Sequence, residues 1–327
     1  MGVRFDPHWR YHGLECLRVE NEHVALEILP DVGAKIHRIV DKARDHNVLW
    51  HAPRVAPHTA PLGSNFDDHW AGGWDEAFPG GEASATRYGD AIPYMGELWT
   101  QRAEWHVEEC SAQRVVLVFS ILTPITTARW QRRLTVEAGV SAFTVDYRIE
   151  NIGLRPFDFN WGLHPVQAIS PAHRFDVPAR QAEVAEDGGG VLGRVGDRYR
   201  WPLFGDRDLC RALGPEALDF TLHYLTELDD GWLACTDTAA RRGFGLTFDR
   251  EVFPVVWLWA SYGGWRGAYH AIVEPWTGYP SSLADATALG RARVLAPGEA
   301  LETSLSAVVY GGVESVSSLQ ADGSVRP

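Results

Sequence analysis

The strongest constraint on the fold is a two-residue alternation of apolar and polar side chains. In residues 143–150, Phe143, Val145, Tyr147 and Ile149 alternate with polar residues. Because successive side chains of a β-strand point to opposite faces, this segment is predicted to be a strand with one buried face. The same alternation recurs in residues 115–121, 130–136 and 301–309, and no stretch longer than about twelve residues has helical spacing.

Turn residues separate these segments. The chain has 32 Gly and 19 Pro, and several of them lie between apolar runs, for example at 30–33, 137–139 and 296–298. Many short strands divided by turns favour an all-β fold, a large antiparallel β-sandwich. The 327 residues contain no internal repeat and no long linker. We therefore predict a single domain over residues 1–327, with its core over about 15–311.

Composition and charge exclude several classes of partner. The chain is 45% hydrophobic and 22% charged, which is ordinary for a globular protein, and its net charge of −13 disfavours nucleic acid. Residues 1–10 carry Arg4, Asp6 and His8 where a signal peptide would need an apolar core. The longest apolar stretch, residues 252–260, is far shorter than a membrane-spanning helix. We expect neither export nor a membrane partner, and the oligomeric state has no signal in the sequence.

The reactive side chains indicate a protein without a metal or cofactor. The four cysteines form no C-x-x-C pair, which predicts a reduced, cytoplasmic chain; they are Cys16, Cys110, Cys210 and Cys235. Among 13 His, only His8 and His12 and the run 67–69 suggest a ligand pair, and neither has diagnostic spacing. No dinucleotide-binding glycine motif, phosphate-binding loop or serine-nucleophile motif is present.

Tryptophan is abundant, with 14 residues. Most are expected in the core, but sugar rings stack on indole faces while sugar hydroxyls need polar partners nearby. Six tryptophans lie beside charged residues, histidine or glycine, and they predict a groove for a small-molecule carbohydrate: Trp70, Trp74, Trp99, Trp161, Trp259 and Trp276.

Two segments place carboxylates between glycines and aromatic residues. In residues 72–80, Asp75 and Glu76 follow Gly72-Gly73-Trp74, and either could accept hydrogen bonds from sugar hydroxyls. In residues 94–99, Glu97 lies between Gly96 and Trp99. The alternative is that these acids are solvated or purely structural.

Two further segments carry candidates for proton transfer. In residues 159–165, alternation places His164 on the face opposite Trp161 and Leu163, beside the small Gly162, with room for a ligand in front. In residues 270–280, an apolar strand delivers Glu274 directly before a proline, so the carboxyl group is expected to be partly buried with a raised pKa. The alternatives are a structural histidine and a buried glutamate paired with an arginine.

Taken together, four motifs resemble the galactose mutarotase-like superfamily, and more narrowly its bacterial aldose 1-epimerase-related proteins. They are Gly-Gly-Trp-Asp-Glu-Ala-Phe-Pro at 72–79, Gly-Glu-Leu-Trp at 96–99, Trp-Gly-Leu-His-Pro at 161–165 and Val-Glu-Pro-Trp-Thr-Gly at 273–278. Their order and spacing extend the resemblance over nearly the whole chain. It implies a β-supersandwich of twisted antiparallel sheets with an open sugar-binding cleft.

The resemblance also implies an isomerase, a mutarotase that interconverts the α and β anomers of a reducing sugar without a cofactor. His164 would be the acid and Glu274 the base, and further residues would line the same cleft: Asp75, Glu76, Glu97 and Trp99. Trp161, one of the tryptophans that predict the sugar groove, is also expected to bind the sugar. One position departs from the pattern, since Met95 stands where relatives often have a histidine.

In this mechanism the Glu274 carboxylate removes the proton of the C1 hydroxyl, and protonated His164 gives a proton to the ring oxygen. A neighbouring carboxylate is expected to raise the pKa of His164. Arg87 and Arg102 are candidates for binding an anionic sugar, or else surface residues. Two other functions stay open: a lyase or epimerase that removes a proton from a sugar carbon, and a non-catalytic carbohydrate-binding protein.

Overall fold

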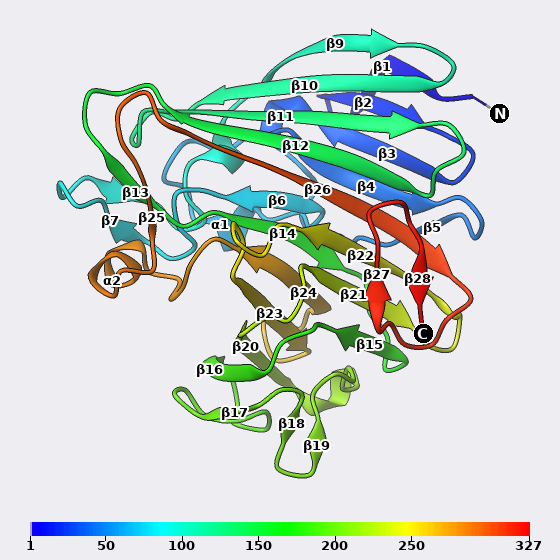
Figure 1. Ribbon diagram of the computed structural model, residues 1–327, viewed down its shortest axis with the longest axis vertical. Coiled ribbons are helices and arrows are strands. Elements are labelled where there is room, and N and C mark those ends of the chain that lie inside the picture. Colours follow the sequence, from blue (N-terminus) through cyan, green and yellow to red (C-terminus); the bar gives the residue numbers. More distant parts are fainter. Residues whose placement is uncertain (1) are drawn as a thin grey trace.

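Two large sheets dominate the computed structural model, which describes residues 2–327 (Figure 1). The first has twelve strands, and its path is β1 (Arg4–Tyr11), β2 (Leu14–Glu20), β3 (Val24–Leu29), β4 (Lys35–Asp41), β6 (Trp74–Ala77), β14 (Gly162–Gln167), β24 (Tyr269–Trp276), β23 (Val255–Tyr262), β20 (Asp219–Thr226), β16 (Gln181–Asp187) and β17 (Arg198–Arg200), with β5 (His46–Asn47) beside β4. The second has eight strands, in the order β15 (His173–Asp176), β21 (Trp232–Asp237), β22 (Arg242–Phe248), β26 (Ala300–Gly311), β12 (Ala142–Asn151), β11 (Ala128–Glu137), β10 (Arg114–Leu122) and β9 (Glu104–Cys110).

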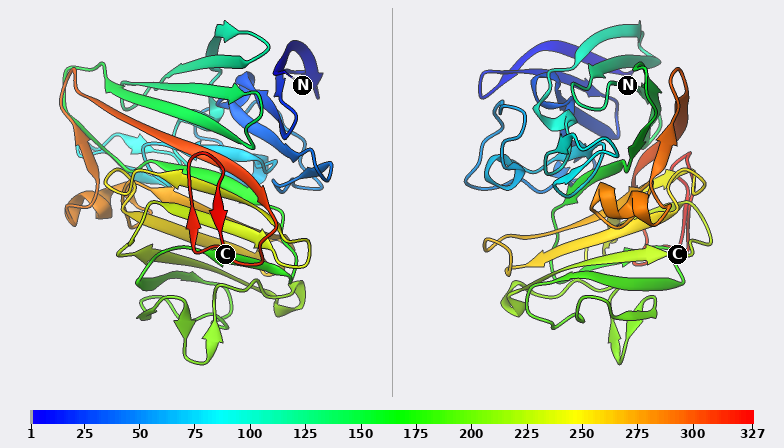
Figure 2. Two further views of the ribbon diagram at one scale, coloured as in Figure 1. Left: turned by 45° about the vertical axis from the view of Figure 1, so that its right-hand side comes forward. Right: turned by 90° about the vertical axis from the view of Figure 1, so that its left-hand side faces the viewer.

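Four short strand pairs and two short α-helices complete the fold. The helices are α1 (Phe66–His69) and α2 (Leu283–Ala288). The strand pairs are β7 (Ser84–Ala85) with β8 (Ala91–Ile92), β13 (Phe157–Phe159) with β25 (Arg293–Leu295), β18 (Leu203–Phe204) with β19 (Arg207–Asp208), and β27 (Ser318–Leu319) with β28 (Val325–Arg326). Figure 1 and Figure 2 agree that the β18–β19 hairpin lies at the end of the molecule away from β9. No helix within residues 2–327 has the length and apolar character needed to cross a membrane.

The predicted all-β sandwich is confirmed, and so are the four alternating segments. They lie in β12, β10, β11 and β26, which are neighbours in the second sheet with antiparallel pairing. In β12 the apolar residues at 143, 145, 147 and 149 are buried and the polar residues between them are half-buried. Alternation therefore predicted both the strands and their inward faces.

One hydrophobic core fills the space between the two sheets. It joins Leu26 and Ile36 of the first sheet to Leu117, Leu134 and Val145 of the second. The central strands β14, β24 and β23 of the first sheet are buried on both faces, because one face meets this core and the other meets a cluster of aromatic side chains. That second, aromatic face carries the candidate site. All four cysteines are free thiols.

Candidate functional site

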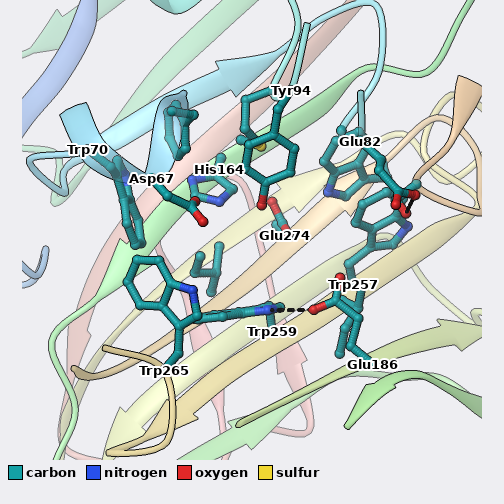
Figure 3. A pocket seen from close by; sticks show the side chains of 17 residues that line it. Asp67, Trp70, Glu82, Tyr94, His164, Glu186, Trp257, Trp259, Trp265 and Glu274 are labelled. Carbon is teal, nitrogen blue, oxygen red and sulfur yellow. Dashed lines mark hydrogen bonds between the residues drawn. The ribbon is translucent and has the colours of Figure 1, made fainter. Parts of the chain in front are cut away.

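A pocket opens on the aromatic face of β14, β24 and β23 (Figure 3). It encloses about 700 Å³, its open mouth included. Alternation selects the residues that face it, since Ile272, Glu274 and Trp276 of β24 line the pocket while Ala271 and Val273 lie in the core. The lining consists of Phe66, Asp67, Trp70, Gly81, Glu82, Tyr94, Met95, His164, Glu186, Leu222, Trp257, Trp259, Trp265, Ile272, Glu274, Trp276 and Ser281.

His164 and Glu274 lie opposite each other on neighbouring strands. The antiparallel register of β14 and β24 pairs Gly162 with Trp276 and Val166 with Ile272, which places His164 across from Glu274. Directly opposite residues have Cβ atoms roughly 4.5–5.5 Å apart with side chains on the same face. Each residue precedes a proline, which keeps its backbone extended. Two residues 110 positions apart in the chain therefore reach one pocket.

Burial keeps His164 neutral. Its side chain is 7% exposed, and Nδ1 has no hydrogen-bond partner within residues 2–327. Burial lowers the pKa of His164 to about 3, and the positive charge of Lys35 acts in the same direction. The expectation that a carboxylate raises this pKa is therefore wrong. Removal from water outweighs the one contribution that raises this pKa, a backbone hydrogen bond.

Glu274 is also buried, at 2% exposure, and its Oε2 is unpartnered in the described chain. Burial raises the pKa of Glu274 well above its usual value, the Trp276 indole opposes this shift, and the negative charge of Glu186 adds to it. The described residues form no ion pair between Glu274 and an arginine, the alternative that the sequence left open. Burial therefore favours the neutral form of both groups, an uncharged imidazole and a protonated carboxyl group.

Tryptophan rings build the wall next to this pair. Trp257 and Trp276 stack with ring centroids 3.7 Å apart and an interplanar angle of 7°. The Trp276 ring occupies the space above Gly162, so the room that the sequence suggested in front of this glycine is filled by an indole. Of the six tryptophans expected at a sugar groove, Trp70, Trp259 and Trp276 line the pocket, whereas Trp74 and Trp161 lie in the core.

Replacing Gly162 with alanine is expected to disturb this wall. The added Cβ would lie 2.0 Å from Cε2 of Trp276, and the stack with Trp257 limits how far the indole can move. Overpacking of this kind costs about 1–3 kcal/mol. Thermal unfolding and sugar titration should show reduced stability together with weaker binding. An unchanged affinity would show that the Trp276 position does not matter to the ligand.

Met95, at the position where the family resemblance led us to expect a histidine, lines the pocket as a buried side chain. Its neighbour Tyr94 extends into the pocket, and the phenol oxygen points toward the Glu274 carboxyl group (Figure 3). A second histidine, His270, lies on the same face of β24, packed against Trp50 and Trp259. Burial, and then the proximity of His164, lower the pKa of His270 to about 3.

Asp75 and Glu97 do not line the pocket, which corrects the sequence-based prediction. Asp75 is paired with His164 in the register of β6 and β14, but its Oδ2 lies 2.9 Å from Nζ of Lys35 in an adjoining space. Glu97 is fully buried and accepts hydrogen bonds from the backbone N–H groups of Ile125 (2.6 Å) and Thr126 (3.2 Å). Both carboxylates therefore hold loops and strands in place.

Glu76 and Trp161 also lie outside the pocket, on the core side. Alternation on β6 points Glu76 away from Asp75 and into the space between the sheets. There the Trp161 Nε1 group donates to Glu76 Oε2 at 3.0 Å. The tryptophan that was expected to stack on a sugar instead donates its polar hydrogen to a buried carboxylate.

The other predicted binding residues occupy different places. Trp99 lies next to the pocket, against Phe66. Arg87 donates to Asp158 (Nε to Oδ2, 2.6 Å), and Arg102, 66% exposed, pairs with Asp31 and Glu15. Neither arginine lines the pocket, and each is occupied by a carboxylate. The prediction that they bind an anionic sugar is therefore not supported.

Three rim carboxylates were missed by sequence reasoning: Asp67, Glu82 and Glu186. Asp67 lies on α1, Glu82 lies just beyond the motif at 72–79, and Glu186 lies near the end of β16, so none of the three belongs to the four motifs. The only local signal was the alternation in β16, which is interrupted by a bulge between Val184 and Glu186.

Comparison with known proteins gives a fold but no close relative. No family model matches the chain, and no curated protein matches it. A candidate aldose 1-epimerase from Klebsiella pneumoniae superposes with a TM-score of 0.73 at 16% identity, over 94% of this chain and 83% of that one. A galactose mutarotase-like protein from Lactobacillus casei gives a TM-score of 0.63 at 16% identity, over 90% of this chain and 100% of that one.

A TPR-domain containing protein from Parabacteroides distasonis is also similar, with a TM-score of 0.66 at 14% identity. The match covers 90% of this chain but only 47% of that protein, so this chain spans about half of its length. The chain therefore has the galactose mutarotase-like fold. Identities this low carry the architecture and leave the activity to be argued from the pocket.

Proposed function

We propose that the protein is a sugar mutarotase of the aldose 1-epimerase type. The observation that supports this most is the pairing of His164 and Glu274 across neighbouring strands, both buried and both facing an aromatic-walled pocket. Anomer exchange requires one proton acceptor and one proton donor at the same carbon centre. Tryptophan faces suit the C–H surface of a sugar, and the rim carboxylates accept hydrogen bonds from its hydroxyls.

The protonation of the pair reverses the roles expected from the sequence. Neutral His164 removes the proton of the C1 hydroxyl, while protonated Glu274 gives its proton to the ring oxygen as the C1–O bond breaks. After rotation about C1–C2, the Glu274 carboxylate takes back the hydroxyl proton as that oxygen attacks the other face of C1. Protonated His164 then returns its proton to the carbonyl oxygen. Each positioned group contributes about 10²–10⁴-fold.

We assign to Tyr94 the sugar-binding role expected of a histidine at position 95. Its phenol lies in the pocket and points toward Glu274, so it can donate a hydrogen bond to a sugar oxygen held there. Methionine at 95 keeps this part of the lining apolar.

The test starts from pure α anomers of several reducing sugars in the presence of the protein. NMR should show faster appearance of the β anomer for at least one sugar than in buffer. A sugar that binds without faster exchange would instead support the carbohydrate-binding alternative. In D2O, loss of a carbon-bound proton or formation of an unsaturated product would support the lyase or epimerase alternative.

The residues that line the pocket disfavour a lyase or epimerase that removes a proton from the carbon next to a sugar carboxylate. Removing a proton next to a sugar carboxylate builds negative charge on the carboxylate, which a nearby cation must stabilise. Within residues 2–327, neither lysine nor arginine lines the pocket. Proton transfer between oxygens, as in mutarotation, needs no such cation.

His164 is expected to be neutral at pH 7, and this can be measured. Because its pKa is lowered to about 3, lowering the pH from 7 to 5 should leave the 15N shifts of the imidazole unchanged. The pH profile of the exchange rate cannot distinguish the two assignments of acid and base. A neutral imidazole with a protonated carboxyl group carries as many protons as a protonated imidazole with a carboxylate. An imidazole that titrates near 6.5 would contradict the reversed roles.

A further inference from the structure

The charges around the pocket are of one sign. Besides the protonated Glu274, three carboxyl groups line it, from Asp67, Glu82 and Glu186, and no lysine or arginine of the described chain does so. Negative groups gathered without counter-ions repel one another, and they lower the energy of a cation placed among them.

The imbalance is concentrated at one end of the pocket. Asp67 has a cation nearby, since Nη2 of Arg266 lies 3.9 Å from its Oδ2. Glu82 and Glu186 form no ion pair with any residue from 2 to 327. Their hydrogen bonds come from neutral groups: the Ser281 hydroxyl donates to Glu82 at 3.0 Å, and the Trp259 indole donates to Glu186 at 3.2 Å. Figure 3 shows Glu82 and Glu186 together on the side of Trp257, away from Asp67.

Aromatic faces complete this end. Trp257 and Trp259 both line the pocket there, and Trp257 is held flat by its stack on Trp276. An ammonium group over an indole face is attracted by the ring quadrupole, and a carboxylate beside the ring strengthens the attraction. Carboxylates combined with tryptophan faces bind ammonium groups better than neutral hydroxyls.

The buried pair shows that this pocket is built for a ligand. His164 and Glu274 are more than nine-tenths buried, both face the pocket, and each has a polar atom without a partner in the described residues. An unpartnered buried polar group is costly unless a ligand satisfies it.

The end of the pocket at Glu186 is separated from the end at Glu274. Glu186 pairs with Leu222, Leu222 with Trp259, and Trp259 with Ile272 on the strand of Glu274. Three strand spacings correspond to roughly 14 Å between the backbones.

We propose that the ligand is a cationic reducing sugar, an amino sugar whose ammonium group lies between Glu82 and Glu186 while its C1 lies at His164 and Glu274. The placement of C1 at His164 and Glu274 rests on the proposed mutarotase function. The placement of the ammonium group does not. The span between the two ends indicates that the amino group is on a carbon remote from C1. It also predicts that sugar phosphates and uronates are rejected, because their charge has the same sign as the rim.

Calorimetric titration at low salt tests this with D-glucose, 2-amino-2-deoxy-D-glucose, 3-amino-3-deoxy-D-glucose, its N-acetylated form and D-glucuronate. We expect the 3-amino sugar to bind about tenfold more tightly than glucose, as charge-assisted contacts are worth more than neutral ones. N-acetylation or added salt should remove the preference, because the first removes the charge and the second screens it. Glucuronate should bind most weakly.

Three variants test whether the preference for the amino sugar comes from Glu82 and Glu186 or from a general effect on the fold. Glu82→Gln and Glu186→Gln should each weaken binding of the 3-amino sugar more than binding of glucose, so that the preference for the amino sugar falls. Glu183→Gln on the same strand β16 is the matched control, since Glu183 lies outside the pocket and pairs with Arg198. Equal affinities for the amino sugar and glucose, tighter binding of glucuronate, or no binding of any of these sugars would overturn the inference. Tight binding of the amino sugar without faster anomer exchange would instead overturn the mutarotase proposal and leave the cation site standing.

Discussion

Replacing Glu274 with glutamine is expected to slow anomer exchange by about 10²–10⁴-fold, the usual contribution of a positioned acid or base. Glutamine keeps the shape of the side chain and can still donate a hydrogen bond, but it cannot release a proton to the ring oxygen. Sugar affinity should change much less than the exchange rate. NMR exchange measurements on purified protein give the rate, and titration gives the affinity.

The same variant should be more stable than the wild type, by an amount that grows with pH. The pKa of Glu274 is raised in the folded protein, so above about pH 4.5 the unfolded chain releases a proton that the folded chain retains. Stability is therefore lost as the pH rises toward the folded pKa, at about 1.4 kcal/mol per pH unit from this one group. Glutamine has no such dependence.

Urea unfolding of both proteins at several pH values from 5 to 8 measures this difference, with Glu183→Gln, outside the pocket and half-buried, as the control. A variant that keeps full exchange activity would remove Glu274 from the proposed mechanism. Parallel stability curves would show that Glu274 is ionised in the folded protein. A loss of rate combined with a pH-dependent gain in stability is what a buried proton donor predicts and what a structural glutamate does not.

Much of the fold could be predicted because the patterns that indicate it lie within single strands of the sequence. Alternation in β10, β11, β12 and β26 identified the strands and their buried faces, as each pattern lies within one strand. The same rule placed His164 on the face opposite Trp161 and Leu163, as the structure has it. The partnership of His164 with Glu274 came from a family resemblance, because strand register between distant segments has no local signature.

The remaining features depend on contacts between distant parts of the chain. Asp75 and Glu76 are neighbours in the sequence, and composition cannot tell which faces the pocket side and which the core. One clue was available: the inward position of Arg132 in the alternation of β11 requires a buried carboxylate somewhere. The pKa of His164 was predicted in the wrong direction, since burial depends on the packing of several aromatic side chains around it.

The Glu76 side chain connects the two sheets, and its removal is expected to have the largest effect on stability. From the first sheet it accepts hydrogen bonds from groups of the second, at 3.0 Å from Trp130 Nε1, 2.6 Å from the Tyr147 hydroxyl and 3.3 Å from Arg132 Nη1. Arg132 is 1% exposed, so Glu76→Ala would leave its charge buried without this partner. Breaking a buried ion pair from one side costs about 3–5 kcal/mol.

Urea unfolding measures this loss, and a double variant identifies its cause. Arg132→Met in the Glu76→Ala background should recover part of the stability, because the uncompensated cation is removed and its volume is largely kept. Sugar binding by the folded fraction should persist, since Glu76 points away from the pocket. The opposite result, lost sugar binding with unchanged stability, would return Glu76 to the ligand-binding role that its position beside Asp75 first suggested. The structure predicts the first result because every hydrogen bond that it shows to the Glu76 carboxylate comes from within the core.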